Sequence, residues 1–283
     1  MKNKIIAASI AMVMILICFV PIFIFFGRER KENYGIVCFG DSVMACYYGD
    51  GSIPYYLEEI TGYPTLNAAF GGLSMSVPSI ETISGDTSYL YSMAELSEAL
   101  VNKDFSLQIM GTKPRVNEYP ERWNEIPKVL DNLNYESIEY IIIEHGVNDY
   151  LLGKPIDNPN DPYDVYSFAG ALRTVIENVR KAVPGATIVL TTPTYCYIDY
   201  VDKDCYEADF GGGTLPDYVA KEKEIAAEYG VICVDNFNES GITKDNYKDY
   251  LYDGLHSHQG GNLLIADNIV DHLEGTRRNE ITP

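Results

Sequence analysis

The stretch IEYIIIEHGVND, residues 138–149, decides the class of fold. Its first part is an almost continuous apolar run rich in β-branched isoleucine, which is typical of a strand buried on both faces of a sheet. The stretch turns polar at Gly146-Val147-Asn148-Asp149, where the apolar run ends. A buried strand followed at once by polar residues favours an α/β protein with its reactive groups at the strand ends.

Other apolar segments along the chain complete this picture. Short apolar runs predict further strands at residues 36–40, 65–69, 186–193 and 231–235. Apolar residues at helical spacing predict helices at residues 88–101, 122–133, 165–183, 217–230 and 262–275. Pro127 falls in the first turns of its predicted helix, and residues 195–216 predict a long, mobile loop. Strands that alternate with helices indicate a parallel sheet covered on both faces.

Four polar segments lie at the ends of predicted strands or just before the last helix. They are Gly40-Asp41-Ser42, the glycine-rich turn 67–72, the segment 146–149 and Asp253-Gly254-Leu255-His256. Because the carboxyl ends of parallel strands meet at one edge of the sheet, we expect these segments to gather there.

In their order, these segments resemble the blocks of the SGNH (GDSL-like) hydrolase superfamily: GDS, N-x-x-x-x-G, G-x-N-D and D-x-x-H. The resemblance covers roughly residues 35–274. It implies a flavodoxin-like three-layer α/β/α sandwich with a mostly parallel five-stranded sheet. It also implies a triad and an oxyanion hole. The implied triad is Ser42, Asp253 and His256, and the implied oxyanion donors are Ser42, Gly72 and Asn148.

The chain departs from the family pattern at two positions. Val43 stands where the common form has leucine, which changes the packing behind the nucleophile and should be tolerated. Ser257 stands where a proline often follows the histidine, which predicts a looser loop around His256, although the glycine at position 261 is retained.

The residue types also suit ester hydrolysis on chemical grounds. A serine hydroxyl needs a base, and histidine has a pKa near working pH. A carboxylate three residues before the histidine can fix its tautomer. Each residue has a simpler interpretation as well: Ser42 as a helix N-cap, Asn148 as a turn residue and His256 as a surface histidine. We expect Asp41 to be a structural hydrogen-bonding residue and Asp149 to orient its loop.

Other catalytic patterns fit poorly. The chain has no GxSxG, no GxxxxGK[ST] and no HExxH segment. His256 and His258 lie two residues apart but lack a nearby cysteine or third histidine, so we predict neither a metal site nor a cofactor.

The N-terminus predicts a membrane anchor. Residues 5–26 carry no charge, and a helix of this length spans roughly 33 Å, enough for a bilayer core. We therefore expect an uncleaved signal anchor with the hydrolase domain outside the cytoplasm. The expected organisation is an anchor over 1–27, a linker over 28–34, a hydrolase domain over 35–275 and a tail over 276–283.

Charge and cysteine content narrow the partners. The net charge is −20, and residues 32–283 hold 16 basic and 40 acidic residues. This acidity disfavours nucleic acid and suits neutral or cationic partners, although it also simply keeps a protein soluble. Cys196 and Cys205 bracket a polar loop and can either pair outside the cell or stay reduced.

The abundance of tyrosine suggests a class of substrate. Tyrosines follow the nucleophile and the fourth strand, at positions 47, 48, 195, 197 and 200. Such rings suit sugars, although they can equally be packing residues. We expect removal of a small acyl group, such as acetyl, from a carbohydrate or another small-molecule ester. The alternatives are an O-acyltransferase acting on cell-envelope polymers with the same triad and a non-catalytic glycan-binding module.

Overall fold

A computed structural model of the protein describes residues 31–46, 49–78, 92–111 and 120–281. The chain divides into two compact units, residues 1–32 and 33–283, and the second holds the fold. The anchor predicted over residues 5–26 lies outside the described residues. In the described part of the chain, none of the helices combines the length and apolar character of a membrane span.

The second unit is built on one five-stranded sheet. Its strands are β1 (Ile36–Gly40), β2 (Thr65–Asn67), β3 (Tyr140–Glu144), β4 (Thr187–Thr191) and β7 (Ile232–Val234). They are all parallel, in the order β2-β1-β3-β4-β7. The chain moves outward in one direction from β1 to β2 and in the other from β3 to β7. The ends of β1 and β3 therefore form the switch point at which open α/β sheets bind ligands.

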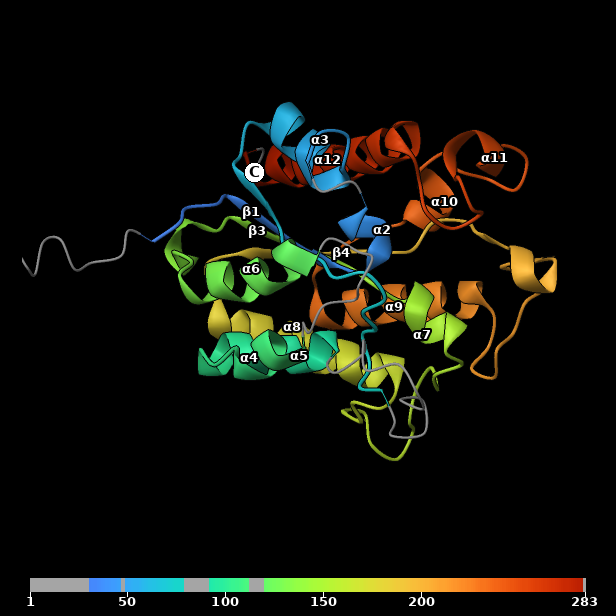
Figure 1. Ribbon diagram of the computed structural model, residues 1–283, viewed down its shortest axis with the longest axis horizontal. Coiled ribbons are helices and arrows are strands. Elements are labelled where there is room, and N and C mark those ends of the chain that lie inside the picture. Colours follow the sequence, from blue (N-terminus) through green and yellow to red (C-terminus); the bar gives the residue numbers. More distant parts are fainter. Residues whose placement is uncertain (1–30, 47–48, 79–91, 112–119, 282–283) are drawn as a thin grey trace, which may run out of the picture. The chain divides into compact units, whose positions relative to one another are not determined.

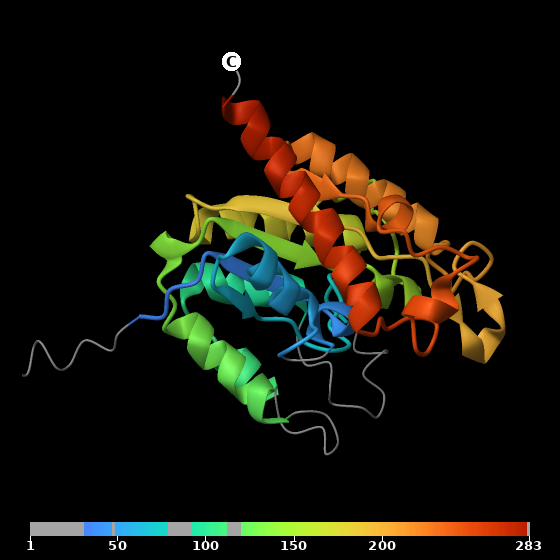
Figure 2. The same cartoon turned by 90° about the horizontal axis from the view of Figure 1, so that it is seen from above.

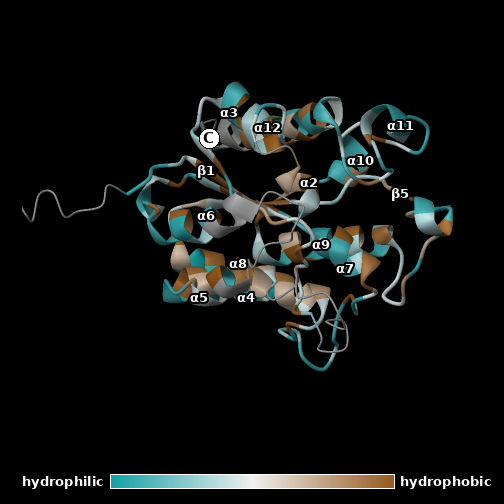
Figure 3. Cartoon of the chain, in the orientation of Figure 1, coloured by the Kyte–Doolittle hydropathy of each residue, from teal (hydrophilic) through white to brown (hydrophobic). Residues whose placement is uncertain are grey.

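Helices cover both faces of the sheet (Figures 1 and 2). One face is covered by α3 (Ile53–Thr61) and α12 (Gln259–Ile281). The other is covered by α4 (Met93–Asn102), α5 (Ser106–Gly111), α6 (Pro120–Asp131), α8 (Phe168–Ala182) and α9 (Leu215–Tyr229). In Figure 3 these helices carry both hydrophobic and hydrophilic residues along their length, as expected of elements with one buried side.

The sheet divides the core into two clusters. Ile141 and Ile143 pack in the larger cluster, whereas Tyr140 and Ile142 pack in the smaller one beneath α3 and α12. This alternation follows from the two-residue period of a strand. Because both faces of β3 are buried, its sequence is an apolar run rather than an alternating pattern.

Short elements complete the edge at which the strands end. They are α2 (Ser42–Ala45), α7 (Val147–Leu151), α10 (Asn236–Glu239), α11 (Tyr247–Tyr250) and a two-stranded hairpin of β5 (Tyr197–Ile198) and β6 (Lys203–Asp204). Single turns of 3₁₀-helix lie at η1 (Tyr135–Ser137) and η2 (Asp199–Val201).

Three local predictions differ from the structure. Helix α6 begins at Pro120, so Pro127 lies in its interior; proline suits the first position of a helix, and that start signal was missed. The predicted mobile loop 195–216 contains the β5–β6 hairpin, whose two-residue strands are too short to show a periodic pattern. Helix α12 continues to Ile281. The helix passes Gly275, where an added Cβ atom would meet no neighbouring atom.

Candidate active site

Ser42 is held at the turn between β1 and α2. It is the first residue of α2 and follows the last residue of β1 by two positions. Asp41 caps this helix, because its Oδ1 accepts the backbone N–H of Val43 at 2.9 Å. Val43 is buried in the smaller core cluster, so valine at this position packs without difficulty. The turn therefore fixes the Ser42 hydroxyl at the sheet's switch point.

Ser42, His256 and Asp253 form one hydrogen-bonded chain. His256 Nε2 lies 2.7 Å from Ser42 Oγ. On the other side of the ring, His256 Nδ1 lies 2.7 Å from Asp253 Oδ2. With Nδ1 protonated, the ring donates to the carboxylate and Nε2 accepts the serine hydroxyl. The His256 side chain is 21% exposed and that of Asp253 is 41% exposed, so both are open to substrate and solvent.

Asp253 also shapes its own loop. Its Oδ1 accepts the backbone N–H groups of Leu255 at 3.0 Å and His256 at 2.7 Å. Burial alone raises the pKa of Asp253, but the hydrogen bonds from the ring and backbone of His256 outweigh it and lower the pKa below its usual value. Asp253 is therefore ionised and able to stabilise an imidazolium.

Ser257 fastens the loop rather than loosening it. Its side chain is buried, and its hydroxyl donates to Asn262 Oδ1. Asn262 in turn donates to the carbonyl of Gly51 at 2.9 Å. Residues Leu251 and Ser257 also form an antiparallel bridge across the loop. The expected weakness at Ser257 is therefore wrong, because a buried hydrogen bond replaces the stiffness of a proline.

The candidate oxyanion donors come from three neighbouring segments. The N–H of Ser42 belongs to the first turn of α2, whose leading N–H groups have no partner within the helix. Gly72 occupies the third position of the turn 70–73 with φ of 76°, a conformation typical of glycine in a type II turn. Asn148, in α7, donates from Nδ2 to the carbonyl of Leu73 at 3.2 Å. This bond places the Asn148 amide beside the Gly72 turn.

Two further motif residues tie the segments together. Asn67, the first residue of the second block, donates to the carbonyl of Met44 at 3.3 Å and accepts the N–H of Ala69 at 3.1 Å. It therefore joins the turn after β2 to α2, the helix that begins with Ser42. Asp149 accepts the N–H groups of Met75 at 2.7 Å and Ser76 at 2.9 Å, which orients the loop that follows Gly72.

A pair of buried acids beneath Ser42 was not anticipated. Glu144 ends β3 directly opposite Gly40 and is buried. Its carboxyl group lies beside that of Asp41, and each of the two acids affects the pKa of the other. Burial raises the pKa of Asp41 to about 6. Burial, together with the charge of Asp41, raises the pKa of Glu144 well above its usual range. An acid inside the apolar run 140–144 was the signal in the sequence.

Aromatic rings lie near the site, but not all those expected. Tyr252, which sequence reasoning missed, lies with its ring nearly parallel to that of His256, at 18° and a centroid distance of 5.7 Å. It is 58% exposed, and its hydroxyl lies 3.8 Å from Cys46 Sγ. Tyr195 is buried, whereas Tyr200 is exposed. Tyr47 and Tyr48 lie outside the described residues.

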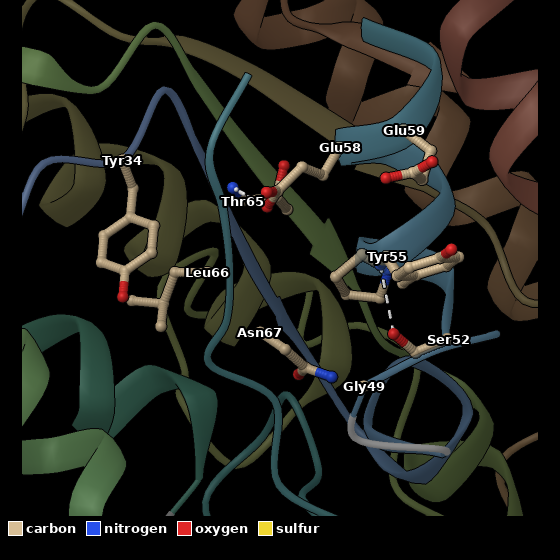
Figure 4. Close-up of a pocket in the computed structure, with 10 residues that line it drawn as sticks. Tyr34, Gly49, Ser52, Tyr55, Glu58, Glu59, Thr65, Leu66 and Asn67 are labelled. Atoms are coloured by element: carbon tan, nitrogen blue, oxygen red, sulfur yellow. Dashed lines mark hydrogen bonds between the residues drawn. The ribbon is translucent and has the colours of Figure 1, made fainter. Parts of the chain in front are cut away.

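A separate pocket of about 290 Å³ lies at the outer edge of the sheet, between β2 and α3 (Figure 4). Asn67 lines it together with Tyr34, Tyr55, Glu58 and Glu59, and the triad residues do not. The side chain of Glu58 accepts the backbone N–H of Thr65, in the edge strand β2, at 2.8 Å. One of the two acids that line the pocket is therefore already hydrogen-bonded. The pocket is therefore distinct from the hydrogen-bonded group of Ser42, His256 and Asp253.

Comparison with known proteins agrees with this geometry. Residues 38–263 match the GDSL-like Lipase/Acylhydrolase family, and this segment includes all four motif blocks. The chain belongs to this family. A GDSL esterase/lipase of Arabidopsis thaliana is 29% identical over 134 residues, which cover 44% of this chain and 54% of that protein. The chain thus matches about half the length of this curated relative.

Solved structures share the GDSL fold at low sequence identity. A protein from Lactobacillus plantarum has a TM-score of 0.61 and 18% identity, covering 87% of this chain and 99% of that chain. A carbohydrate acetylesterase from Sinorhizobium meliloti has a TM-score of 0.51 and 15% identity, covering 85% of this chain and 98% of that chain. At these identities the likeness concerns the fold alone.

Proposed function

We propose that the protein is a serine esterase that hydrolyses a small acyl ester, with Ser42 as nucleophile, His256 as base and Asp253 as its carboxylate partner. The observation that carries this proposal is the chain of hydrogen bonds from Ser42 Oγ through His256 to Asp253, both steps at 2.7 Å. Separations of this kind allow proton transfer without rearrangement.

In the proposed mechanism, His256 Nε2 takes the Ser42 proton as Oγ attacks the ester carbonyl. The carbonyl oxygen becomes negative, and the Ser42 N–H, the Gly72 N–H and the Asn148 amide are the donors proposed to stabilise it. His256 then gives its proton to the leaving alcohol, and an acyl-serine is left. A water molecule repeats the sequence, releasing the acid and restoring Ser42.

We propose a carbohydrate as the alcohol part of the ester. Because His256 protonates the leaving alcohol, groups beside its ring face that part of the substrate. The exposed ring of Tyr252 lies there, and an aromatic face suits the apolar face of a sugar. The net charge of −20 favours a neutral glycan over an anionic polymer. A carbohydrate acetylesterase with the same fold is consistent with an acetyl ester.

The test is a panel of p-nitrophenyl esters of increasing acyl length and acetylated oligosaccharides. We expect turnover to fall as the acyl chain lengthens and Ser42→Ala to abolish it. Unchanged turnover in Ser42→Ala would remove the nucleophile from the proposal. Tyr252→Ala should raise KM for the acetylated sugar more than for p-nitrophenyl acetate, while Tyr252→Phe should behave like the wild type.

The same panel separates the two alternatives. An acyltransferase would move the acyl group to an added glycan acceptor without net hydrolysis, because the sugar hydroxyl replaces water in the second step. A glycan-binding module would bind the oligosaccharide and leave all esters intact in both the wild type and Ser42→Ala.

We propose further that residues 5–26 anchor the protein in a membrane, with the esterase domain outside the cytoplasm. The uncharged stretch of 22 residues supports this placement. The full chain should sediment with membranes and resist extraction by high salt, whereas a chain starting at residue 33 should stay in the supernatant. With the esterase domain outside the cytoplasm, protease added to intact cells should cleave the full chain.

A further inference from the structure

The β5–β6 hairpin lies against the loop that carries Asp253 and His256. The N–H of Tyr197, in β5, donates to the carbonyl of Gly254 at 2.8 Å. Gly254 adopts φ of 80°, and a Cβ atom there would come within 2.3 Å of the Tyr197 carbonyl oxygen. The two backbones are therefore in direct contact, and no side chain fits between them.

Side chains extend this contact on both strands of the hairpin. The ring of Tyr197 stacks on that of Tyr247, at 15° and a centroid distance of 5.5 Å. Tyr247 belongs to α11, which leads directly into the loop. On β6, Asp204 forms an ion pair with Lys244, which precedes α11. The hairpin is therefore in contact with the residues that precede the loop carrying Asp253 and His256.

Two cysteines lie opposite each other at the base of this hairpin. The register pairs Tyr197 with Asp204, so Cys196 and Cys205 are the next opposing positions. The N–H of Cys205 donates to the carbonyl of Cys196 at 3.0 Å. Opposing residues of an antiparallel pair have Cα atoms about 4.5–5.5 Å apart, which lies within the range found across disulfides.

The environment of the two thiols agrees with this pairing. Cys196 is 1% exposed and Cys205 is fully buried, and both are free thiols here. The side chain of Cys205 raises the pKa of the Cys196 thiol well above its ordinary value, and that of Cys196 lowers the pKa of the Cys205 thiol, as expected of two neighbouring sulfur atoms. Cys38 and Cys233 lie in β1 and β7, separated by two strands, so roughly 14 Å of sheet keeps them apart.

We propose that Cys196 and Cys205 form a disulfide that closes the base of the hairpin and stiffens the support of the triad loop. A disulfide oxidant, such as oxidised glutathione, accepts the two electrons. One thiolate attacks the oxidant to give a mixed disulfide, and the second thiolate displaces the remaining oxidant thiolate. Two protons leave the cysteines, one S–S bond forms, and the oxidant becomes two thiols.

Burial of the sulfur atoms determines how the bond behaves. It forms as the hairpin folds, and the folded protein then shields it from reductants. We expect dithiothreitol to leave the bond intact under native conditions and to reduce it in urea. Closing the short loop between Cys196 and Cys205 should raise the Tm of the oxidised protein by roughly 5–10 °C over that of the reduced protein.

The experiment uses the full chain refolded with oxidised glutathione or with a reductant. Peptide mapping of the oxidised wild type should find Cys196 linked to Cys205, with the other cysteines open to alkylation. The Cys196→Ser/Cys205→Ser protein should lose the difference in Tm between the two conditions, whereas Cys233→Ser should keep it.

Several outcomes would overturn the proposal. They are alkylation of both thiols in the oxidised wild type, a link from either thiol to another cysteine, and a Tm difference that persists in the double variant. Peptide mapping needs only the wild type, so it decides the question even if the double variant does not fold. Neither readout depends on ester turnover, and the disulfide and the esterase proposal therefore fail separately.

Discussion

Replacing Asp41 by asparagine should stabilise the protein at neutral pH. Asp41 is fully buried, and its carboxyl group lies beside the buried carboxyl of Glu144. An asparagine keeps the capping oxygen for the Val43 N–H and places an amide where Oδ2 was, beside Glu144. The substitution therefore removes a buried charge and keeps the helix cap.

The magnitude follows from the shift in pKa. Burial raises the pKa of Asp41 from 3.8 to about 6. The folded protein thus holds the Asp41 proton more tightly than the unfolded chain does. The free energy of unfolding is therefore highest below pH 3.8, where Asp41 is protonated in both states, and it falls as the pH rises towards 6. About two units at roughly 1.4 kcal/mol each give about 3 kcal/mol. Asp41→Asn should recover most of this at about pH 7.5 and little at about pH 4.

The assay is urea unfolding of the wild type and variants at both pH values. Asp149→Asn is the matched control: Asp149 is equally buried, but both its oxygens accept backbone N–H groups. Burial raises the pKa of Asp149 as well. However, the asparagine NH2 group would lie opposite one of these backbone N–H donors and leave it without an acceptor. The free energy of unfolding of this variant should therefore fall by about 2 kcal/mol or more. An equal gain for Asp41→Asn at both pH values, or none at the higher one, would refute the reasoning.

Further substitutions test the triad, the oxyanion donors and the loop contact. Asp253→Asn should lower kcat about 10⁴-fold with an unchanged circular dichroism spectrum, because an amide favours the wrong histidine tautomer; a loss below tenfold would contradict this. Asn148→Ala should lower kcat by ~10²–10³ with little change in KM, and an effect on KM alone would exclude a role in the transition state. Gly254→Ala should reduce both stability and turnover, because its Cβ meets the Tyr197 carbonyl. Gly241→Ala, at a similar φ of 82° but in open space, should cost only about 1 kcal/mol and leave turnover intact.

The sheet was predictable because its strands are buried on both faces. Each of the five apolar runs contains the observed strand, since no helix of three or more turns fits into runs so short. The short elements were not predictable. Helix α2 has four residues and the strands of the hairpin have two each, which is about one period of a helix or strand pattern and too short for a repeat to show. Their positions depend on contacts with distant residues, such as the bond from Tyr197 to Gly254.

The candidate site was predictable where its residues fall in the motif blocks and not where it depends on tertiary neighbours outside them. Ser42, Asp253 and His256 were named from the motifs, and the structure brings them together. Glu144 was visible only as an acid in an apolar run, because the sequence does not show that β3 pairs with β1 and sets it opposite Gly40. Ser257 was misjudged for the same reason: its partner Asn262 lies in the next helix.

The two halves of the site are held in place by different forces. Ser42 and Asn148 follow β1 and β3 directly, so the hydrogen bonds between these strands fix their relative position. His256 follows no strand. Its place depends on Asp253, on the bridge between Leu251 and Ser257, and on the hairpin behind Gly254. Contacts of this second kind can weaken while the sheet stays folded, because local openings need far less free energy than global unfolding. We therefore expect ester turnover to be more sensitive to the supports of the His256 loop than the stability of the fold is, and the disulfide proposed at the base of the hairpin would strengthen one of these supports.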